Sequence, residues 1–285
     1  MTDLANRGLL GRAERLDRAV ATMQTRFTPM FPGGEIQETG RAIWTLTATP
    51  LLVANGVIRY DARDFHGPQS ERELDSRLAV LSTYDVPWRF CAWEHLGADL
   101  LVPRLVARGL VGTDSSPAMW LDVRAPAPTI AREDGVKIRP AVHASDHYLW
   151  TQIFTEVFGI PSEYEDVFEL IVAKSHSFSA VAYADGQPVG CLSMAIEDSL
   201  AVVDNLGVLP SSRRHGVGRR LLEAAHAAAA ARGVKACVVV AAPAGTGIRA
   251  KLGYEVVTSV THLRPAPRPD LTGVSQGLAE QPTLP

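Results

Sequence analysis

Apolar and polar positions in the C-terminal half of the chain follow two periods, one typical of strands and one typical of helices. Short apolar runs alternate with longer segments in which apolar residues recur every three or four positions, the spacing of one helix face. From residue 136 to residue 263 these patterns predict the order β-α-α-β-β-β-α-β-α-β. Within this region Asp185-Gly186 separates two strand-like runs, and this dipeptide predicts a tight hairpin turn.

The N-terminal half also mixes helical and strand-like patterns. Apolar positions spaced as on a helix cover residues 12–26, and the prolines and glycines of 27–40 predict a loop. Strands are expected at 42–47 and 51–60, and Asn55-Gly56 alternatively predicts a turn that divides the second run.

A helix is expected next, over residues 70–82, because Ser70 and Glu73 have the spacing of a capping box. Three further elements follow: a strand at 88–93, a helix at 99–108 and a strand at 118–123. The order strand, loop, helix and glycine recurs in 88–110 and in 237–254, which indicates a duplicated fold.

Two segments rich in proline divide the chain. Residues 124–135 combine proline with charge and offer little to bury, so we expect a boundary there between domains of residues 1–130 and 134–265. Residues 266–285 are also rich in proline and poor in apolar side chains, and they are expected to form a disordered tail.

Composition narrows the class of protein. The chain has 285 residues, of which 46% are hydrophobic, and this length fits two cores better than one. A net charge of −3 argues against nucleic acid or an anionic membrane as partner. No apolar stretch approaches 18 residues, so a soluble, cytoplasmic protein is expected. Three isolated cysteines (Cys91, Cys191 and Cys237) are interpreted as buried side chains, and no metal site is expected.

Residues 204–223 carry the clearest chemical signal. A strand-like run ends at Leu209, Pro210 follows, and a basic loop then leads into a helix that starts at about Gly216. The first N–H groups of a helix lack partners within the helix and lie at the positive end of its dipole. With Gly216 and Gly218 leaving room and Arg213 adding charge, the pattern predicts a phosphate-binding loop.

The spacing Arg213-x-x-Gly216-x-Gly218 resembles the Q/R-x-x-G-x-G/A signature of the GNAT N-acetyltransferase superfamily. Residues 250–255, Ala-Lys-Leu-Gly-Tyr-Glu, resemble the ending of that family's last helix and strand. The resemblance implies an α/β (α+β) fold, the GNAT acyl-CoA N-acyltransferase fold, with a mixed central sheet flanked by helices. It also implies a catalytic domain in residues 134–265, with residues 1–130 forming a degenerate copy of the same fold.

The resemblance further implies how a cofactor binds. The backbone of Leu206, Gly207 and Val208 would pair with the pantetheine arm of acetyl-CoA as an added strand does. The pyrophosphate would accept hydrogen bonds from a run of residues: Arg213, Arg214, His215, Gly216, Val217 and Gly218, with Arg219. A backbone N–H would polarise the acyl carbonyl, and an amine would attack it directly, without an enzyme nucleophile.

Two residues decide the acid and base steps that the resemblance implies. Arg249 stands where many family members have a tyrosine that protonates the leaving thiolate, and an arginine does not donate a proton near neutral pH. Arg249 is expected to stabilise the thiolate or to contact a cofactor phosphate by charge. Asp204, on the strand before the loop, is the candidate general base.

The predicted function is transfer of an acyl group, most simply acetyl, from acyl-CoA to a primary amine of a small molecule or peptide. Two alternatives stay open: a CoA-binding regulatory module without catalysis, and an aminoacyl-tRNA-dependent transferase of the same fold. We expect one cofactor per chain, in the C-terminal half, and no metal; the sequence leaves the oligomeric state open. His143 and His147 are interpreted as surface side chains, and His226 as exposed on its helix.

Overall fold

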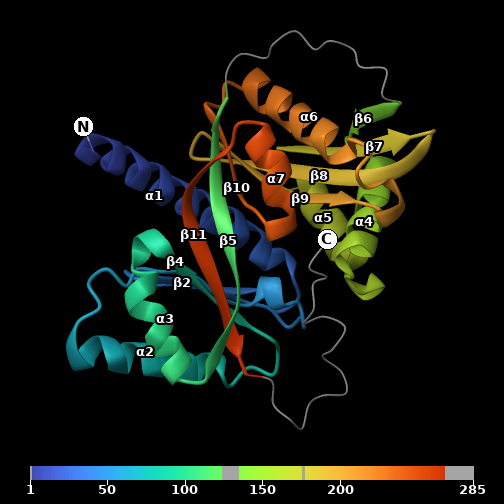
Figure 1. Ribbon diagram of the computed structural model, residues 1–285. Helices are drawn as coiled ribbons and strands as arrows, with labels where there is room; N and C mark the ends of the chain where they lie inside the picture. Colours follow the sequence, from blue (N-terminus) through green and yellow to red (C-terminus); the bar gives the residue numbers. More distant parts are fainter. Residues whose placement is uncertain (1, 124–134, 175–176, 267–285) are drawn as a thin grey trace. The chain divides into compact units, whose positions relative to one another are not determined.

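The computed structural model describes residues 2–123, 135–174 and 177–266 (Figure 1). The chain divides into two compact units. Among the described residues, the N-terminal unit contains 2–118, 240–243 and 256–266, and the C-terminal unit contains the remainder. The expected boundary segment at 124–134 and the expected tail from residue 267 lie outside the described residues.

In the N-terminal unit the strand order is β1-β2-β3-β4-β11-β5. Its elements are α1 (Thr2–Phe27), β1 (Glu35–Glu38), β2 (Ala42–Leu46), β3 (Gly56–Tyr60), α2 (Gly67–Leu81), β4 (Arg89–Trp93), α3 (Ala98–Ala107), the first part of β5 (Leu110–Asp122) and most of β11 (Glu255–Pro265). β3 and β4 run parallel, and β11 runs antiparallel to β4.

In the C-terminal unit the strand order is β5-β10-β9-β8-β7-β6. Its elements are β6 (Val136–Pro140), α4 (Ala144–Phe158), α5 (Glu165–Lys174), β7 (Phe178–Ala184), β8 (Gln187–Glu197), β9 (Leu200–Val208), α6 (Val217–Ala231), β10 (Ala236–Val240) and α7 (Pro243–Lys251). The predicted succession of helices and strands and the mixed α/β fold class are confirmed. Asp185 and Gly186 both have positive φ, as the predicted hairpin turn requires.

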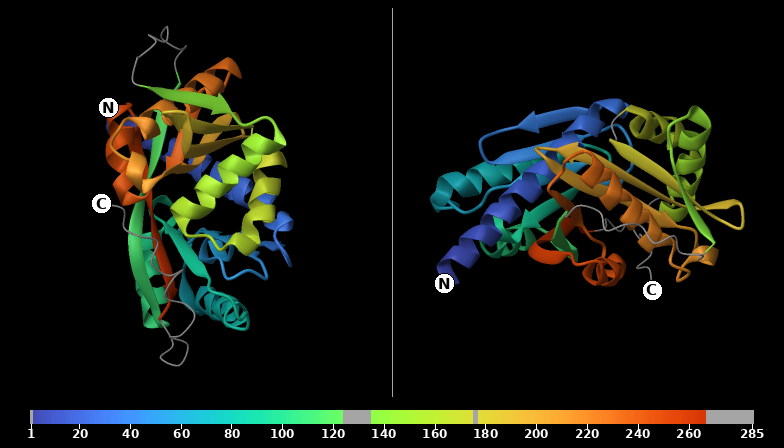
Figure 2. Two further views of the ribbon diagram at one scale, coloured as in Figure 1. Left: turned by 90° about the vertical axis from the view of Figure 1, so that its right-hand side faces the viewer. Right: turned by 90° about the horizontal axis from the view of Figure 1, so that it is seen from above.

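Helices cover both faces of the C-terminal sheet (Figure 2). On one face α4 and α5 pack through aromatic rings, and the fully buried Trp150 donates its indole N–H to the carbonyl of Leu192 at 2.9 Å. The other face is covered by α6, whose buried positions Leu221, Leu222 and Ala225 have helical spacing. A long, Ala-rich helix therefore forms because one of its faces is apolar throughout.

The last strand of the chain has an unexpected place. β11 follows the C-terminal elements in sequence, yet Val260 lies opposite Trp93 and Leu263 opposite Phe90 in the N-terminal sheet. The C-terminal unit in turn includes the end of β5, where the N–H of Val123 donates to the carbonyl of Lys235 at 2.8 Å. Each sheet is therefore completed by a strand from the opposite half of the sequence.

The segment before β3 is not part of a continuous strand over residues 51–60. The strand begins only at Gly56, so the turn interpretation of Asn55-Gly56 is confirmed. The buried Asn55 side chain accepts the N–H of Thr47 at 2.7 Å and donates to the carbonyl of Thr49 at 2.9 Å. Gly56 has φ of +119°, and a Cβ there would lie 1.8 Å from the carbonyl oxygen of Arg89. Only glycine fits this position.

Other element boundaries also required correction. The expected loop at 27–40 contains strand β1, and β5 extends far beyond the expected 118–123. Ser70 is not a helix cap, because α2 begins at Gly67 with His66 as its cap residue. The Ser70 hydroxyl instead donates to the carbonyl of His66 at 3.1 Å, one turn back in the helix.

The place of β11 leads to a stability prediction. Leu263 is fully buried in the N-terminal core, whereas Val256 on the same strand is 53% exposed. We expect Leu263→Ala to lower the free energy of unfolding by about 2–5 kcal/mol. We expect Val256→Ala to change it by less than about 0.5 kcal/mol. Denaturant titrations of both variants, followed by tryptophan fluorescence, measure the difference; equal effects would contradict the assignment of β11 to this core.

Candidate functional site

The C-terminal sheet opens between β9 and β10. The two strands pair in parallel at three positions, of which the last is Val202 opposite Val238. β9 nevertheless continues to Val208 and stays paired with β8 as far as Gly190. The pairing with β10 therefore ends in the middle of β9. The second half of β9 is paired with β8 and has no pairing with β10.

A β-bulge marks the start of this divergence. Gly207 lies opposite Cys191, and Asp204 lies opposite Ser193, so β9 spans the interval with one residue more than β8 does. Asn205 has φ of +53°, a left-handed conformation that asparagine tolerates better than most residues. Its side-chain amide donates to the Ser193 hydroxyl at 3.0 Å, which holds the bulge in place. Bulges bend a strand and increase its twist.

The loop after β9 leads directly into the start of α6. Arg214 and Gly216 have φ of +67° and +81°, and Gly216 is the residue that precedes the helix. No side chain caps this helix start, and its first turn contains no acidic residue. The first N–H groups of α6 therefore have no partner within the helix, the arrangement that favours an anion. The sequence predicted this succession of a strand, a basic loop and a helix that starts at about Gly216, but it did not predict the bulge at Asn205.

The basic residues of the loop differ in their partners. The Arg213 guanidinium donates through Nε to the carbonyl of Val208 at 3.1 Å, which ties the loop to the end of β9. Arg214 and His215 are exposed. Arg219 is half exposed and forms an ion pair of 2.8 Å with Glu223, one turn along α6. Surface pairs of this kind contribute little energy, so Arg219 is available to an anion at the helix start.

Helix α7 lies beside both the helix start and the end of β9. A Cβ built at Gly218 would be 3.6 Å from Cδ1 of Ile248 and 3.8 Å from Cγ2 of Val208, which are ordinary contacts. Gly207 is more confined, because a Cβ there would be 3.2 Å from Sγ of Cys191 and 3.3 Å from Cε2 of Phe158. A side chain larger than hydrogen would therefore be crowded at Gly207, whereas at Gly218 it would make only ordinary contacts.

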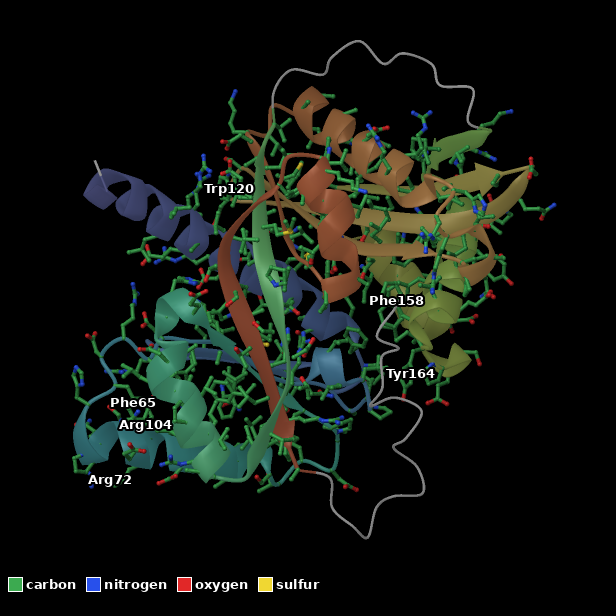
Figure 3. The ribbon with its side chains drawn as sticks, viewed as in Figure 1. Phe65, Arg72, Arg104, Trp120, Phe158 and Tyr164 are labelled. Carbon is green, nitrogen blue, oxygen red and sulfur yellow. The ribbon has the colours of Figure 1, made fainter. Side chains whose placement is uncertain are left out.

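Figure 3 labels Phe158 together with Tyr164, from the end of α4 and the turn before α5. The ring of Phe158 packs against Phe154, with centroids 4.9 Å apart. Because Phe158 also lies close to Gly207, an aromatic wall borders one face of β9 at the predicted cofactor strand.

Arg249 is the buried basic residue of this region. It is 6% exposed, and its Nη1 donates to the carbonyl of Gly245 at 2.9 Å within α7. Its Nε has no hydrogen-bond partner. Burial lowers the pKa of Arg249, and electrostatic interactions with Tyr254 and Asp204 oppose this effect. The structure therefore brings Arg249 and Asp204, both predicted from sequence, into one neighbourhood.

Sequence reasoning missed a second buried polar group beside Arg249. The Tyr254 hydroxyl and His226 Nε2 are 2.9 Å apart, and Tyr254 also hydrogen-bonds Cys237. Burial lowers the pKa of His226 to about 4, raises the pKa of Cys237 to about 12 and raises the pKa of Tyr254 well above its ordinary value. The expectation that His226 is exposed is wrong, since the ring turns inward to meet a residue 28 positions away.

The N-terminal unit repeats the strand divergence but fills it. β3 and β4 pair only at Gly56 with Arg89 and at Val57 with Phe90. Beyond this point the Trp93 indole N–H donates to the carbonyl of Ile58 at 3.0 Å. A large buried side chain of the unit itself therefore occupies the backbone acceptor that the divergence exposes.

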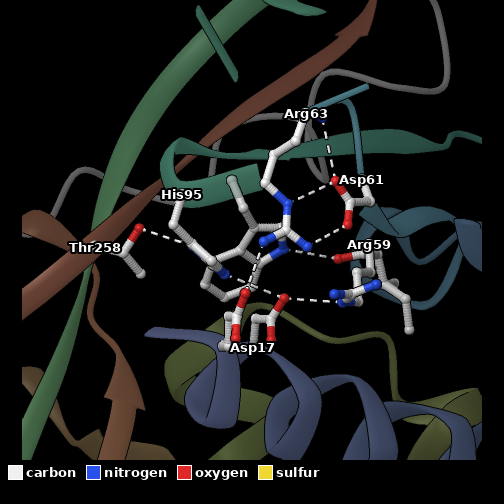
Figure 4. A network of polar contacts seen from close by, with 9 residues as sticks. Asp17, Arg59, Asp61, Arg63, His95 and Thr258 are labelled. Atoms are coloured by element: carbon white, nitrogen blue, oxygen red, sulfur yellow. Dashed lines mark hydrogen bonds and ion pairs between the residues drawn. The ribbon is translucent and has the colours of Figure 1, made fainter. Parts of the chain in front are cut away.

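Charged side chains form a network of hydrogen bonds and ion pairs beside the same two strands of the N-terminal unit (Figure 4). The buried Asp17 carboxylate accepts Arg59 Nε at 2.8 Å and lies 3.3 Å from Nε2 of His95. The other ring nitrogen of His95 is 3.0 Å from the Thr258 hydroxyl. In the loop after β3, Arg63 is held by two carboxylates, those of Asp61 and Glu14. The charge of Arg63 is thus already compensated within the unit.

Pockets and metal groups add little to this picture. Two pockets of about 260 Å³ lie in the N-terminal unit, and neither is lined by a predicted site residue. Within the described residues, no group of three or more His, Cys, Asp or Glu side chains is arranged to hold a metal ion. In the same residues, no helix combines the length and apolar character needed to cross a bilayer.

Comparison with known proteins agrees with the geometry. The model of the acetyltransferase (GNAT) family matches residues 147–250. No curated protein matches the chain in sequence.

Solved structures extend the likeness over both units. A GCN5-related N-acetyltransferase from Kribbella flavida is 18% identical, with a TM-score of 0.63 over 90% of this chain and 97% of that chain. A GCN5-related N-acetyltransferase from Sphaerobacter thermophilus is 15% identical, with a TM-score of 0.57 over 79% and 80%. A tandem GNAT protein from the clavulanic acid biosynthesis pathway is 14% identical, with a TM-score of 0.57 over 86% and 88%. At these identities the likeness establishes the fold alone.

The open β9–β10 ladder, the uncapped start of α6 and the match at residues 147–250 agree with one another, and the chain therefore contains a domain of the acetyltransferase (GNAT) family.

Proposed function

We propose that the C-terminal unit transfers an acyl group, most simply acetyl, from acyl-CoA to a primary amine of a small molecule or peptide. The observation that carries this proposal is the end of the β9–β10 ladder at Val202, which leads along β9 to the uncapped start of α6. An open strand edge suits the amide-containing arm of a ligand, and the helix start that follows it along the chain suits a diphosphate.

The residues along this path suggest how each part of such a ligand would be held. We place the two amides of the pantetheine arm along the backbone of Leu206, Gly207 and Val208; of its groups, the Val208 carbonyl already accepts Arg213 Nε at 3.1 Å, and Gly207 is paired with Cys191 of β8. We place the diphosphate at the start of α6, against the N–H groups from Arg214 to Gly218; the N–H of Arg213 itself donates to the carbonyl of Pro210 at 3.4 Å. Arg214 and Arg219 add positive charge at the rim, and both side chains reach solvent.

The bulge at Asn205 suits the acyl end of the same ligand. A backbone N–H turned out of the ladder there hydrogen-bonds the thioester carbonyl and stabilises the oxyanion that forms during attack. Asp204, half-buried next to the bulge, accepts the proton that the attacking amine loses. Direct attack of this kind requires no covalent intermediate on the protein.

The acceptor is proposed to be cationic in its resting form. Acidic side chains gather on α4, α5 and the turn between them: Glu156, Glu163, Glu165, Asp166 and Glu169. One of them, Glu165, is engaged by Gln152 at 2.7 Å. Negative potential near the aromatic wall of Phe158 attracts an ammonium group before it is deprotonated.

The N-terminal unit is proposed to be a degenerate copy of the same fold. Its support is the divergence of β3 from β4 together with the Trp93 side chain and the Asp17 charges that fill this divergence. The likeness to a tandem GNAT structure agrees with such a duplication. We propose one cofactor per chain, in the C-terminal unit.

A non-catalytic CoA-binding role is the second candidate. The observation in its favour is that Arg249, which does not release a proton near neutral pH, stands in the catalytic region. The two functions differ in one property, the release of free thiol from acetyl-CoA in the presence of an amine.

Gly216 provides the most direct test of cofactor binding. Gly216 and Gly233 flank α6, both have positive φ, and a Cβ at either would meet open space within the protein. Because of backbone strain, alanine at either position lowers the free energy of unfolding by a similar amount, roughly 1–2 kcal/mol. We expect Gly216→Ala to weaken CoA binding about tenfold or more, because its methyl group occupies ligand space. Gly233→Ala is the matched control, and calorimetry that gives both variants wild-type affinity would contradict the proposal.

Stoichiometry tests the role assigned to the N-terminal unit. Because Trp93 and the Asp17 carboxylate fill the N-terminal divergence, we expect calorimetric titration with CoA to give one site per chain. A second site, or one site that survives Gly216→Ala unchanged, would show that the N-terminal unit binds the cofactor.

Asp204 is tested by a variant that keeps its shape. We expect Asp204→Asn to lower kcat/KM by about 10²–10⁴-fold, because the amide no longer accepts the amine proton. Asp198→Asn, at the exposed tip of the β8–β9 hairpin, is the control and should leave kcat/KM unchanged. Thiol release measured over a panel of amines gives both values, and an Asp204→Asn variant with full activity would exclude this base.

A further inference from the structure

Arg249 is a buried cation whose hydrogen-bonding capacity is only partly used. It is 6% exposed, its Nη1 donates to a carbonyl of its own helix, and its Nε has no acceptor. Taking a charge out of water costs several kcal/mol unless partners compensate for the lost solvation. A guanidinium kept under these conditions therefore points to an anion that is present only at some stage of function.

The groups that face Arg249 come from several elements. Asp204 of β9, Tyr254 and His226 of α6 are close enough to act on it electrostatically. Tyr254 is bonded to His226 and to Cys237 of β10, and Glu223 faces His226.

Most of these neighbours are uncharged near neutral pH. Burial raises the pKa of Tyr254 well above its ordinary value, and it raises the pKa of Cys237 to about 12. Burial also lowers the pKa of His226 to about 4, so its ring is neutral. Glu223 is already paired with Arg219 at 2.8 Å. Among the groups that act on Arg249, the half-buried Asp204 is the carboxyl side chain.

The position of α7 relates Arg249 to the proposed ligand path, and the inference therefore rests on the proposed function. Ile248 lies beside Gly218 and Val208, at the diphosphate end of the path. The next residue, Arg249, lies near Asp204, on the bulged part of β9. The thioester sulfur joins the pantetheine arm to the acyl group, so its place is at the Arg249 end.

We propose that Arg249 is a catalytic residue that stabilises the leaving thiolate of the acyl donor by its positive charge and by the unpaired Nε–H, without transferring a proton. The amine lone pair forms the new C–N bond, and the C–S bond breaks with its electron pair on sulfur. The acceptor enters this step as the neutral amine, its ammonium proton having gone to solvent, and the second proton, which nitrogen loses on attack, goes to Asp204. The thiolate leaves paired with the guanidinium and takes a proton from solvent after release.

The thiol of bound CoA reports this interaction directly and needs no acceptor amine. A cation within contact distance lowers the pKa of an acidic group by about 1–3 units. We expect the thiol of CoA bound to the wild-type protein to ionise at least about one unit below free CoA. Thiolate ultraviolet absorbance, followed against pH at saturating protein, measures this difference.

Three variants separate charge from structure. Arg249→Lys keeps the charge and should retain most of the shift, whereas Arg249→Met should abolish it, since the Asp204 carboxylate then acts alone. Arg232→Met is the matched control, because Arg232 makes the same bond to a carbonyl four residues back, Ala228 at 2.8 Å, but lies exposed at the other end of α6. It should titrate as the wild type does.

The outcomes distinguish this inference from the proposed function. If calorimetry detects no CoA binding to the wild-type protein, the proposed function itself fails, and the role of Arg249 fails with it. If CoA binds but its thiol ionises at the pH of free CoA, only the role of Arg249 is overturned. This second result requires the wild-type protein alone, so a variant that does not fold leaves the inference open to refutation.

Discussion

The divergence of β9 from β10 after Val202 is the constraint on which the candidate site depends. Two parallel strands that separate leave peptide groups that must find another partner, and the bulge at Asn205 fixes where the separation begins. The same strand ends at the uncapped start of α6, where further N–H groups face outward. Both features lie close together along the chain, and the proposed elongated ligand with amides and a diphosphate would use both.

The N-terminal unit shows what happens when the same divergence is filled. Trp93 donates its indole N–H to Ile58, and Asp17 brings together Arg59 and His95 in the interior. These interactions occupy, within the protein, groups that in the C-terminal unit we propose a ligand to occupy. If the proposed function holds, a few buried side chains distinguish the unit that binds the cofactor from the unit that does not.

Local chemistry made part of this site predictable from sequence. The requirement for small residues and positive charge at a helix start is written in consecutive residues, so the loop at Gly216 and Gly218 was recognisable. The bulge at Asn205 and the inward turn of His226 were not, because each depends on a partner distant in sequence. The exchange of β11 into the N-terminal sheet was missed for the same reason: its apolar pattern predicts a strand but not its neighbour. The burial of Arg249 likewise has no signature in the surrounding residues.

Backbone hydrogen exchange with and without CoA tests the central claim most directly, because the claim concerns peptide N–H groups. The account predicts slower exchange in the presence of CoA for amides of 205–208 and 213–219, with amides of 56–67 in the N-terminal unit unchanged. Protection confined to the N-terminal unit, or absent from both the strand and the helix start while CoA is bound, would contradict it.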